Sequence, residues 1–125
     1  MTDDKPWVVV WGVPKKSLEI PCWLMVKHRT RGWELPGGTI GDSEPNEIAA
    51  LRELFEETGL LGVATSFDEQ LFAGGTVVRV EIDEEPQPYG WESDDDSISE
   101  VGWCVEIPGD LYWGADEIQK LLDHD

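Results

Sequence analysis

Residues 38–60 read GTIGDSEPNEIAALRELFEETGL. After a loop over 39–43, this segment predicts a helix over 44–58, with a proline in its first turn and acids near the positive end of its dipole. Ser43 is the expected N-cap, and Gly59 is the expected glycine after the last turn. Four apolar residues at helical spacing are expected to face the core: Ile48, Leu51, Leu54 and Phe55.

Three glutamates share one arc of this helix. If Glu53 lies at 0° and each residue adds 100°, Glu56 falls at about −60° and Glu57 at about +40°, opposite the apolar stripe. Arg52 lies one turn before Glu56 and can pair with it. Clustered carboxylates repel one another, and a hard cation such as Mg²⁺, which is usually shared with substrate phosphates, removes that repulsion. The residue types therefore indicate a Mg²⁺ cluster that awaits a phosphate ester.

A solvated acidic face is the alternative interpretation of this helix, because 27 of the 125 residues are Asp or Glu. Three further features favour a metal site. An arginine lies inside the acidic patch, a glycine stands at each end of the segment, and the back face of the helix is apolar.

The segment from Gly38 to Leu60 resembles the Nudix box, G-x5-E-x7-R-E-U-x-E-E-x-G-U, in which U is a bulky aliphatic residue. All nine specified positions match: Gly38, Glu44, Arg52, Glu53, Leu54, Glu56, Glu57, Gly59 and Leu60. The preceding WELPGG resembles the family's lead into the box. Glu100-x-x-Trp103, followed by a terminal helix, resembles the family's last strand and helix. The resemblance is strong over the box and loose over nearly the whole chain.

The resemblance implies an α+β fold of Nudix type in a single domain over residues 1–125. This fold is an α/β/α sandwich with a mixed β-sheet, a catalytic loop-helix-loop in the middle and a C-terminal helix. The resemblance also implies hydrolysis of nucleoside diphosphates linked to another group, with Mg²⁺ as the cofactor, for which Mn²⁺ can substitute. By position, the implied metal ligands are Glu53, Glu56, Glu57 and a backbone carbonyl near Gly37 or Gly38.

The same resemblance assigns supporting and chemical roles. Arg52 orients the glutamates by ion pairing, and Glu44 supports the loop or reaches the metal through water. Water attacks a phosphorus atom, helped by Mg²⁺ ions that neutralise charge. The general base varies within the family and is Glu53, Glu56 or an acid on a distal loop. Five acids are available for the distal role: Glu92, Asp94, Asp95, Asp96 and Glu100.

Several side chains are candidates for substrate binding. Three cations, Lys27, Arg29 and Arg31, precede the box where the family often contacts phosphate, and Arg79 is a further cation. Aromatic rings that could stack a base are Trp33, Tyr89 and Trp91. For each of these side chains, a solvated charge or ordinary packing is the alternative.

Signatures of particular Nudix subfamilies are mostly missing. LPGG differs from the FPKG-like form of diadenosine polyphosphate hydrolases, and the proline that ADP-ribose pyrophosphatases tend to have downstream of the box is absent. By elimination we expect a MutT-like pyrophosphohydrolase of a (d)NTP, with an ADP-ribose or nucleotide-sugar pyrophosphatase as the alternative. A non-catalytic nucleotide-binding Nudix module is disfavoured because every box glutamate is kept. Removal of pyrophosphate from RNA 5′ ends is disfavoured by the acidic surface.

The rest of the chain reads mainly as strands, with a hairpin turn at Gly74-Gly75 and a long acidic loop over 83–99. A closing helix is expected over 115–122. Strands are expected over 6–13, 18–27, 33–35, 60–65, 67–73, 76–82 and 100–107.

The composition of the chain disfavours several classes of binding partner. Nine Lys and Arg against 27 Asp and Glu give a net charge of −18, which disfavours duplex nucleic acid and anionic membranes. No apolar run has the roughly 20 residues of a membrane span, and no signal peptide is visible. We therefore expect a cytoplasmic monomer or homodimer that takes a small-molecule nucleotide.

Cys22 and Cys104 are expected to be reduced, half-buried thiols rather than zinc ligands.

The −18 charge predicts a dependence of stability on salt, because the folded chain repels itself. Scarce lysine and abundant acid suit a high-salt cytoplasm, with an ordinary acidic protein as the alternative. We expect the melting temperature to rise with KCl up to about 1 M, where the Debye length is about 3 Å. Thermal melts at fixed Mg²⁺ test this, and a flat or falling melting temperature would remove the high-salt interpretation.

Overall fold

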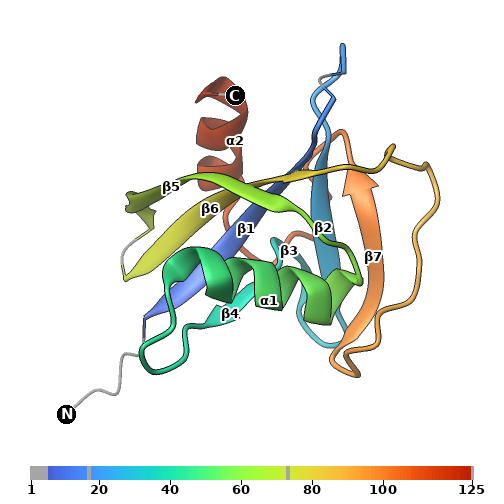
Figure 1. Cartoon of the computed structure of the whole chain (residues 1–125). Helices are drawn as coiled ribbons and strands as arrows, with labels where there is room; N and C mark the ends of the chain where they lie inside the picture. Colours follow the sequence, from blue (N-terminus) through green and yellow to red (C-terminus); the bar gives the residue numbers. More distant parts are fainter. Residues whose placement is uncertain (1–5, 17, 73, 125) are drawn as a thin grey trace.

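The computed structural model describes residues 6–16, 18–72 and 74–124. Seven strands and two helices follow one another along these residues (Figure 1). Their bounds are β1 Trp7–Pro14, β2 Trp23–His28, β3 Gly32–Glu34, β4 Gly37–Thr39, α1 Asn46–Thr58, β5 Val63–Phe72, β6 Gly75–Ile82, β7 Ile98–Cys104 and α2 Ala115–His124.

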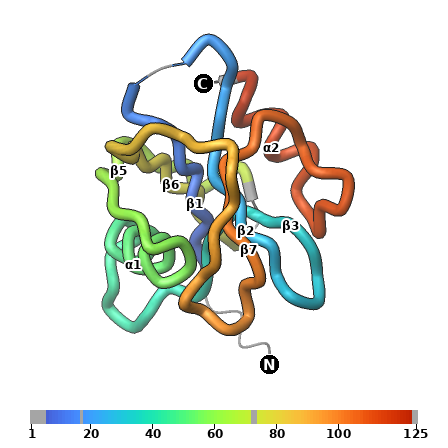
Figure 2. The backbone as a smooth tube through the Cα atoms, turned by 90° about the vertical axis from the view of Figure 1, so that its right-hand side faces the viewer, coloured from blue at the N-terminus to red at the C-terminus, as the bar shows by residue number. Residues whose placement is uncertain are grey.

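The strands form two sheets between the two helices. The larger sheet has the order β4-β1-β6-β5 and is mixed, because β1 and β6 are parallel while the other pairs are antiparallel. The smaller sheet, β3-β2-β7, is antiparallel throughout. Helices α1 and α2 lie on opposite sides of β1 and β6 (Figures 1 and 2). The expected α+β sandwich is confirmed, with its strands divided between two sheets rather than joined in one.

Alternation along β1 builds a core on each side of the larger sheet. Val8 and Val10 point to the α1 side and pack with Leu54 and residues of β6. Val9 and Trp11 point to the other side and pack with Ile118 of α2. A strand covered on both faces reads as the continuous apolar run seen in the sequence.

Strand bounds differ from the expected ones where a proline or a bulge intervenes. β2 begins only at Trp23, because Pro21 keeps the preceding residues out of the ladder. The two strands expected over 60–65 and 67–73 are one strand, β5, whose register shifts at two places. β7 begins earlier than expected, and the chain leaves the sheet after Cys104. Gly74 turns the hairpin with φ of 80°, while Gly75 already belongs to β6.

The ends of α1 agree only in part with the expectation. Gly59 follows the helix with φ of 78°, and its N–H donates to the Phe55 carbonyl, so the predicted C-terminal glycine is confirmed. The predicted N-cap is wrong, because Ser43 adopts a left-handed φ of 61° in the loop and Pro45 precedes the first helical residue. No side chain caps the first turn.

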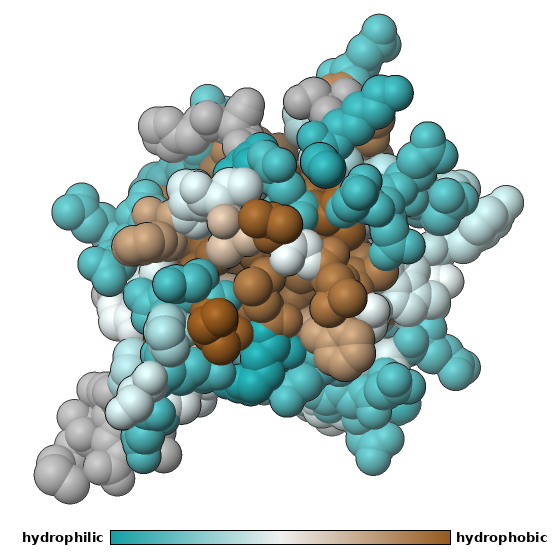
Figure 3. Space-filling view, in the orientation of Figure 1, coloured by the Kyte–Doolittle hydropathy of each residue, from teal (hydrophilic) through white to brown (hydrophobic). Residues whose placement is uncertain are grey.

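The predicted core stripe of α1 is also partly wrong. Ile48 and Phe55 are 50% and 54% exposed, whereas Ala49, Ala50 and Leu54 are buried. Small alanines let the helix approach the sheet closely, which rotates the two larger side chains outward. Apolar side chains accordingly gather on the face of the molecule that carries α1 (Figure 3).

Cys22 is buried and Cys104 is half-buried, and both are free thiols. Burial raises the pKa of each to about 11. Within the described ranges, neither helix is long and apolar enough to cross a membrane.

Candidate active site

The box helix lies over strand β4, and the contact between them depends on Gly38. A Cβ atom at this position would lie 2.0 Å from the Glu53 Oε2 atom. The Glu53 carboxylate therefore rests directly on the β4 backbone. Any larger residue at position 38 would displace that carboxylate, which gives the first residue of the box a physical role.

Glu57 reaches the same strand from the next turn of the helix. The Gly37 N–H donates to the Glu57 Oε1 atom at 3.3 Å, and Glu57 is only 7% exposed. The position of Glu57 on the buried face, beside Leu54, differs from the predicted arc opposite the apolar stripe. Helix α1 therefore holds one carboxylate inside the protein.

Burial, followed by the charge of Glu53, raises the pKa of Glu57 to about 9. Burial also raises the pKa of Glu53, although the charge of Arg52 works against it. Two adjacent carboxylates in a partly buried site do not readily ionise together, because each negative charge disfavours the other.

Arg52 connects the helix to the loop before it. Its Nε atom donates to Glu44 Oε2 at 2.8 Å and its Nη2 atom donates to the Thr39 carbonyl at 3.2 Å. Its Nη1 atom lies 3.1 Å from Glu56 Oε1 and 3.5 Å from Glu53 Oε2. The expected pairing of Arg52 with Glu56 is thus present, and one guanidinium orients three acids.

Glu44 closes the loop at the other end of this ion pair. Besides Arg52, its carboxylate accepts a hydrogen bond of 2.8 Å from the Gly41 N–H. These two hydrogen bonds, with that from Arg52 the stronger, lower the pKa of Glu44 to about 2. Glu44 therefore stays charged and fixes the loop relative to α1.

The donor set suits a hard divalent cation. Its side-chain members, Glu53, Glu56 and Glu57, offer only carboxylate oxygens, and two of them sit where burial disfavours unshared negative charge. Glu56 is turned toward Arg52, and its side chain is 52% exposed. Within residues 6–16, 18–72 and 74–124, no three acidic, His or Cys side chains already converge as a complete metal site. Glu56 is therefore the member of this set whose carboxylate pairs with Arg52 in the structure.

The raised pKa of Glu57 predicts that the metal-free protein loses stability as pH rises. Its folded pKa of about 9 exceeds the ordinary pKa of 4.5 that the unfolded chain has, so the stabilisation is complete below pH 4.5 and is lost as pH approaches 9. The free energy of unfolding, measured by urea titration in EDTA, should fall over this range relative to that of Glu57→Gln. Parallel pH curves for the two proteins would contradict the burial of this carboxylate.

One of the five distal acids lies near the box carboxylates. Asp95 is half-buried, and its charge contributes to the raised pKa of Glu57. Hydrogen bonds from Ser97 lower the pKa of Asp95 itself. The other four acids are exposed: Glu92, Asp94, Asp96 and Glu100. Asp95 is therefore the only half-buried member of these five acids.

The three predicted phosphate-binding cations before the box have partners of their own. Lys27 Nζ lies 3.5 Å from Asp110 Oδ2. Arg31 pairs with Glu34 at 2.7 Å and lies over the Tyr112 ring. Lys27 therefore lies on β2 and Arg31 in the turn between β2 and β3, each next to an acidic partner.

Arg29 contacts the acidic loop. Its Nε atom donates to the Asp96 carbonyl, and its backbone N–H donates to the Ser97 carbonyl at 2.9 Å. Arg29 is therefore placed beside Asp95 and fixes the loop that carries it.

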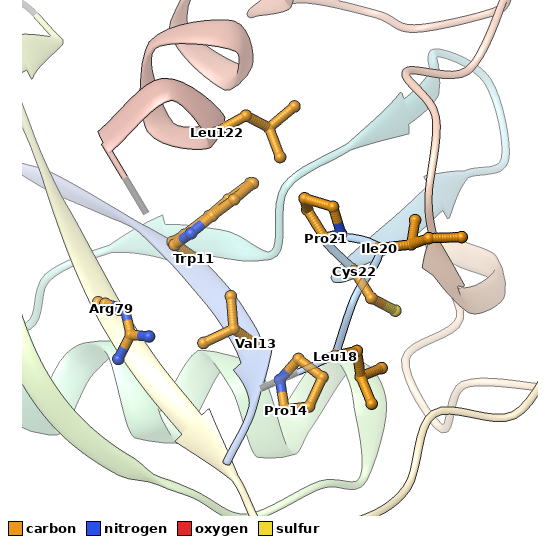
Figure 4. Close-up of a pocket in the computed structure, with 9 residues that line it drawn as sticks. All are labelled: Trp11, Val13, Pro14, Leu18, Ile20, Pro21, Cys22, Arg79 and Leu122. Atoms are coloured by element: carbon orange, nitrogen blue, oxygen red, sulfur yellow. The ribbon is translucent and has the colours of Figure 1, made fainter. Parts of the chain in front are cut away.

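Arg79 does not join the box residues. It alternates along β6 with Val78 and Val80, which pack on the α1 side, so Arg79 points to the α2 side. There its guanidinium pairs with Glu81 at 2.8 Å and borders a pocket of about 150 Å³ with Trp11 and Leu122 (Figure 4). The sequence could not show this, because the face of a strand depends on the register of its neighbours.

The three aromatic residues that are candidates for base stacking lie in different environments. Trp33 lies on β3, where its backbone N–H and carbonyl bond to Asp110 and Tyr112. Tyr89 is exposed in the acidic loop. Trp91 is half-buried against the core, and its indole N–H donates to the Thr58 carbonyl at 2.8 Å. The base-stacking role of Trp91 stays a prediction, and the link of its indole to the end of α1 has no signal in the sequence.

A family model described as NUDIX domain matches residues 8–106, and the chain belongs to the Nudix family. YtkD of Bacillus subtilis (strain 168), provisionally named an 8-oxo-dGTP diphosphatase, is 54% identical over 37 residues. That match spans 30% of this chain and only 23% of YtkD.

Solved Nudix structures share the fold at low identity. RenU, a Nudix hydrolase from M. smegmatis, superposes with a TM-score of 0.71 at 15% identity, covering 97% of this chain and 87% of RenU. The NUDIX domain of Shewanella oneidensis NrtR, complexed with ADP ribose, gives 0.60 at 19% identity, covering 99% and 89%. These similarities establish the architecture alone.

Proposed function

We propose that this protein is a Mg²⁺-dependent pyrophosphohydrolase that cleaves a phosphoanhydride bond in a nucleoside diphosphate derivative. The observation that carries the proposal is the placement of Glu53 on the Gly38 backbone with Glu57 buried beside it. Ionising both carboxylates of such a pair is costly without a cation. The retained box and the family membership supply the class of reaction.

In this reaction, an oxygen of water forms a bond to phosphorus and the anhydride P–O bond breaks. The leaving phosphate keeps the bridging oxygen and its electron pair, and a nucleoside monophosphate is one product of a nucleotide substrate. Bound Mg²⁺ supplies charge neutralisation at the phosphates and a lower pKa for the attacking water. Glu53, Glu56 and Glu57 hold the cation, with a backbone carbonyl of Gly37 or Gly38 as the further ligand we expect.

The remaining residues position these groups. Arg52 and Glu44 fix the loop and restrain Glu56 until the cation binds. The proton of the attacking water goes to a carboxylate, and Asp95 is the distal acid that we favour for that role, since it is the half-buried member of the five. Glu53 and Glu56 are the alternatives within the box.

The substrate we favour is a nucleoside triphosphate, as in MutT-like proteins. The local identity to YtkD, which is provisionally named for 8-oxo-dGTP, supports this choice. ADP-ribose is the second candidate, because a NUDIX domain of the same fold was solved with that ligand. The −18 charge disfavours long polyanions in either case.

A substrate screen tests the proposal. The purified protein is incubated with Mg²⁺ and 8-oxo-dGTP, canonical dNTPs and NTPs, ADP-ribose or UDP-glucose, in ¹⁸O-labelled water. We expect a nucleoside monophosphate among the products and the label in a phosphate. Loss of turnover in EDTA is also expected. Absence of turnover on every phosphoanhydride would favour a nucleotide-binding module, and label on carbon would refute the mechanism.

A further inference from the structure

We propose that Trp91 is a positioning residue whose indole N–H fixes the acidic loop, which carries Asp95, against the end of the box helix. The inference rests on the proposed function, since it concerns the geometry of that same site. The loop passes α1 and then continues into β7, a strand of the smaller sheet (Figure 2).

The side chain of Trp91 reaches the last residue of α1. Its Nε1 atom donates to the Thr58 carbonyl at 2.8 Å, and Thr58 is 3% exposed. The last carbonyls of a helix have no partner within the helix, so the indole satisfies a buried acceptor. Because Thr58 directly follows Glu57, this hydrogen bond acts one residue from an expected metal ligand.

The backbone of Trp91 is held from the other side. Its N–H donates to the Val101 carbonyl, and the Val101 N–H donates back to the Trp91 carbonyl, each at 2.9 Å. This isolated bridge attaches Trp91 to β7, while the ring packs against the core under α1. One residue therefore connects the strand that follows the loop to the helix that carries the carboxylates.

A second set of contacts closes the loop after Asp95. The Ser97 N–H donates to Asp95 Oδ1 at 2.9 Å, the Ile98 N–H donates to the Asp95 carbonyl at 3.0 Å, and Arg29 bonds to the Ser97 carbonyl. Asp95 thus lies between two anchors, with Trp91 as the one that touches the box helix.

Trp91→Phe tests the proposal, because it keeps an aromatic ring and removes the N–H. We expect kcat to fall by about tenfold, with KM within about twofold of wild type, as for outer partners that orient a reacting group. The matched control is Trp103→Phe, since Trp103 is also a half-buried tryptophan against the same core. Equal effects of the two substitutions on kcat would mean a packing role and would overturn the proposal.

A double-mutant cycle shows whether Trp91 acts through Asp95. Asp95→Asn should lower kcat, and adding Trp91→Phe to it should change kcat by less than about twofold, because coupled residues are not additive. Full additivity would overturn the proposal. If Trp91→Phe does not fold, benzothienylalanine at position 91, which replaces the indole N–H with sulfur, serves in the same cycle.

Two results separate this proposal from the proposed function. If the wild-type protein hydrolyses no phosphoanhydride, the proposed function fails, and so does the catalytic part of this inference. If wild type and Trp103→Phe are active and Trp91→Phe matches them, only the role of Trp91 fails. Slow hydrogen exchange of the Trp91 indole N–H in wild type, measured by ¹⁵N NMR, is the expected signature of the hydrogen bond, and rapid exchange would contradict it.

Discussion

Glu57→Gln is expected to lower turnover by more than about 100-fold, beyond the loss typical of outer-shell partners. The change keeps size and helix propensity and removes the group that can ionise and bind a cation. Because Glu57 is 7% exposed and lies beside Glu53, the metal-free variant should be as stable as wild type or more stable. A large loss of activity without a loss of stability is the signature of a residue kept for chemistry.

Glu47→Gln is the matched control for this substitution. Glu47 lies in the first turn of the same helix and is exposed, so its replacement makes the same change of charge away from β4. Turnover against Mg²⁺ concentration, alongside the melting temperature in EDTA, separates the two variants. Near-wild-type turnover of Glu57→Gln would contradict a catalytic role for the carboxylates of α1.

Gly38→Ala should show a similar separation of activity from stability. The added Cβ would lie 2.0 Å from Glu53 Oε2, the end of a flexible side chain that can move aside. We expect a melting temperature within a few degrees of wild type and a loss of turnover of at least about tenfold, because small displacements of reacting groups are costly. The measurement is kcat at saturating Mg²⁺ together with a thermal melt.

Substitutions at two other glycines serve as controls for Gly38→Ala. Gly109→Ala adds a methyl group to open space and should change neither quantity. Gly37→Ala places its Cβ 2.3 Å from the Val8 carbonyl, a backbone atom that cannot turn aside, so it should lower stability as well as activity. Wild-type kcat in Gly38→Ala would show that Glu53 need not rest on β4.

The fold could be predicted where local signals and family resemblance agree. The box helix ends at Gly59 as the glycine predicts, and the sandwich follows the resemblance. The exposure of Ile48 and Phe55 could not be predicted from spacing, because the nearby alanines decide how the helix meets the sheet. The continuity of β5 depends on bulges, which balance local irregularity against pairing with β6.

The residues of the candidate site also differ in how far the sequence predicts their positions. The box residues come together because they share one helix and the strand before it, so their spacing in the sequence is nearly their spacing in space. Arg79 and Asp95 reach their positions through strand register and loop path, which periodicity does not encode. Trp91 illustrates the same limit, since its partner Thr58 is 33 positions away and is a backbone carbonyl.

The central claim is that the carboxylates of α1 hold a divalent cation over Gly38. Calorimetric titration of Mg²⁺ into the metal-free wild type, Glu57→Gln and Glu47→Gln at fixed salt tests it without any substrate. We expect one saturable site in wild type and Glu47→Gln and an affinity at least about tenfold weaker in Glu57→Gln, because Glu57→Gln loses a carboxylate ligand. Equal Mg²⁺ affinity in all three proteins would contradict it.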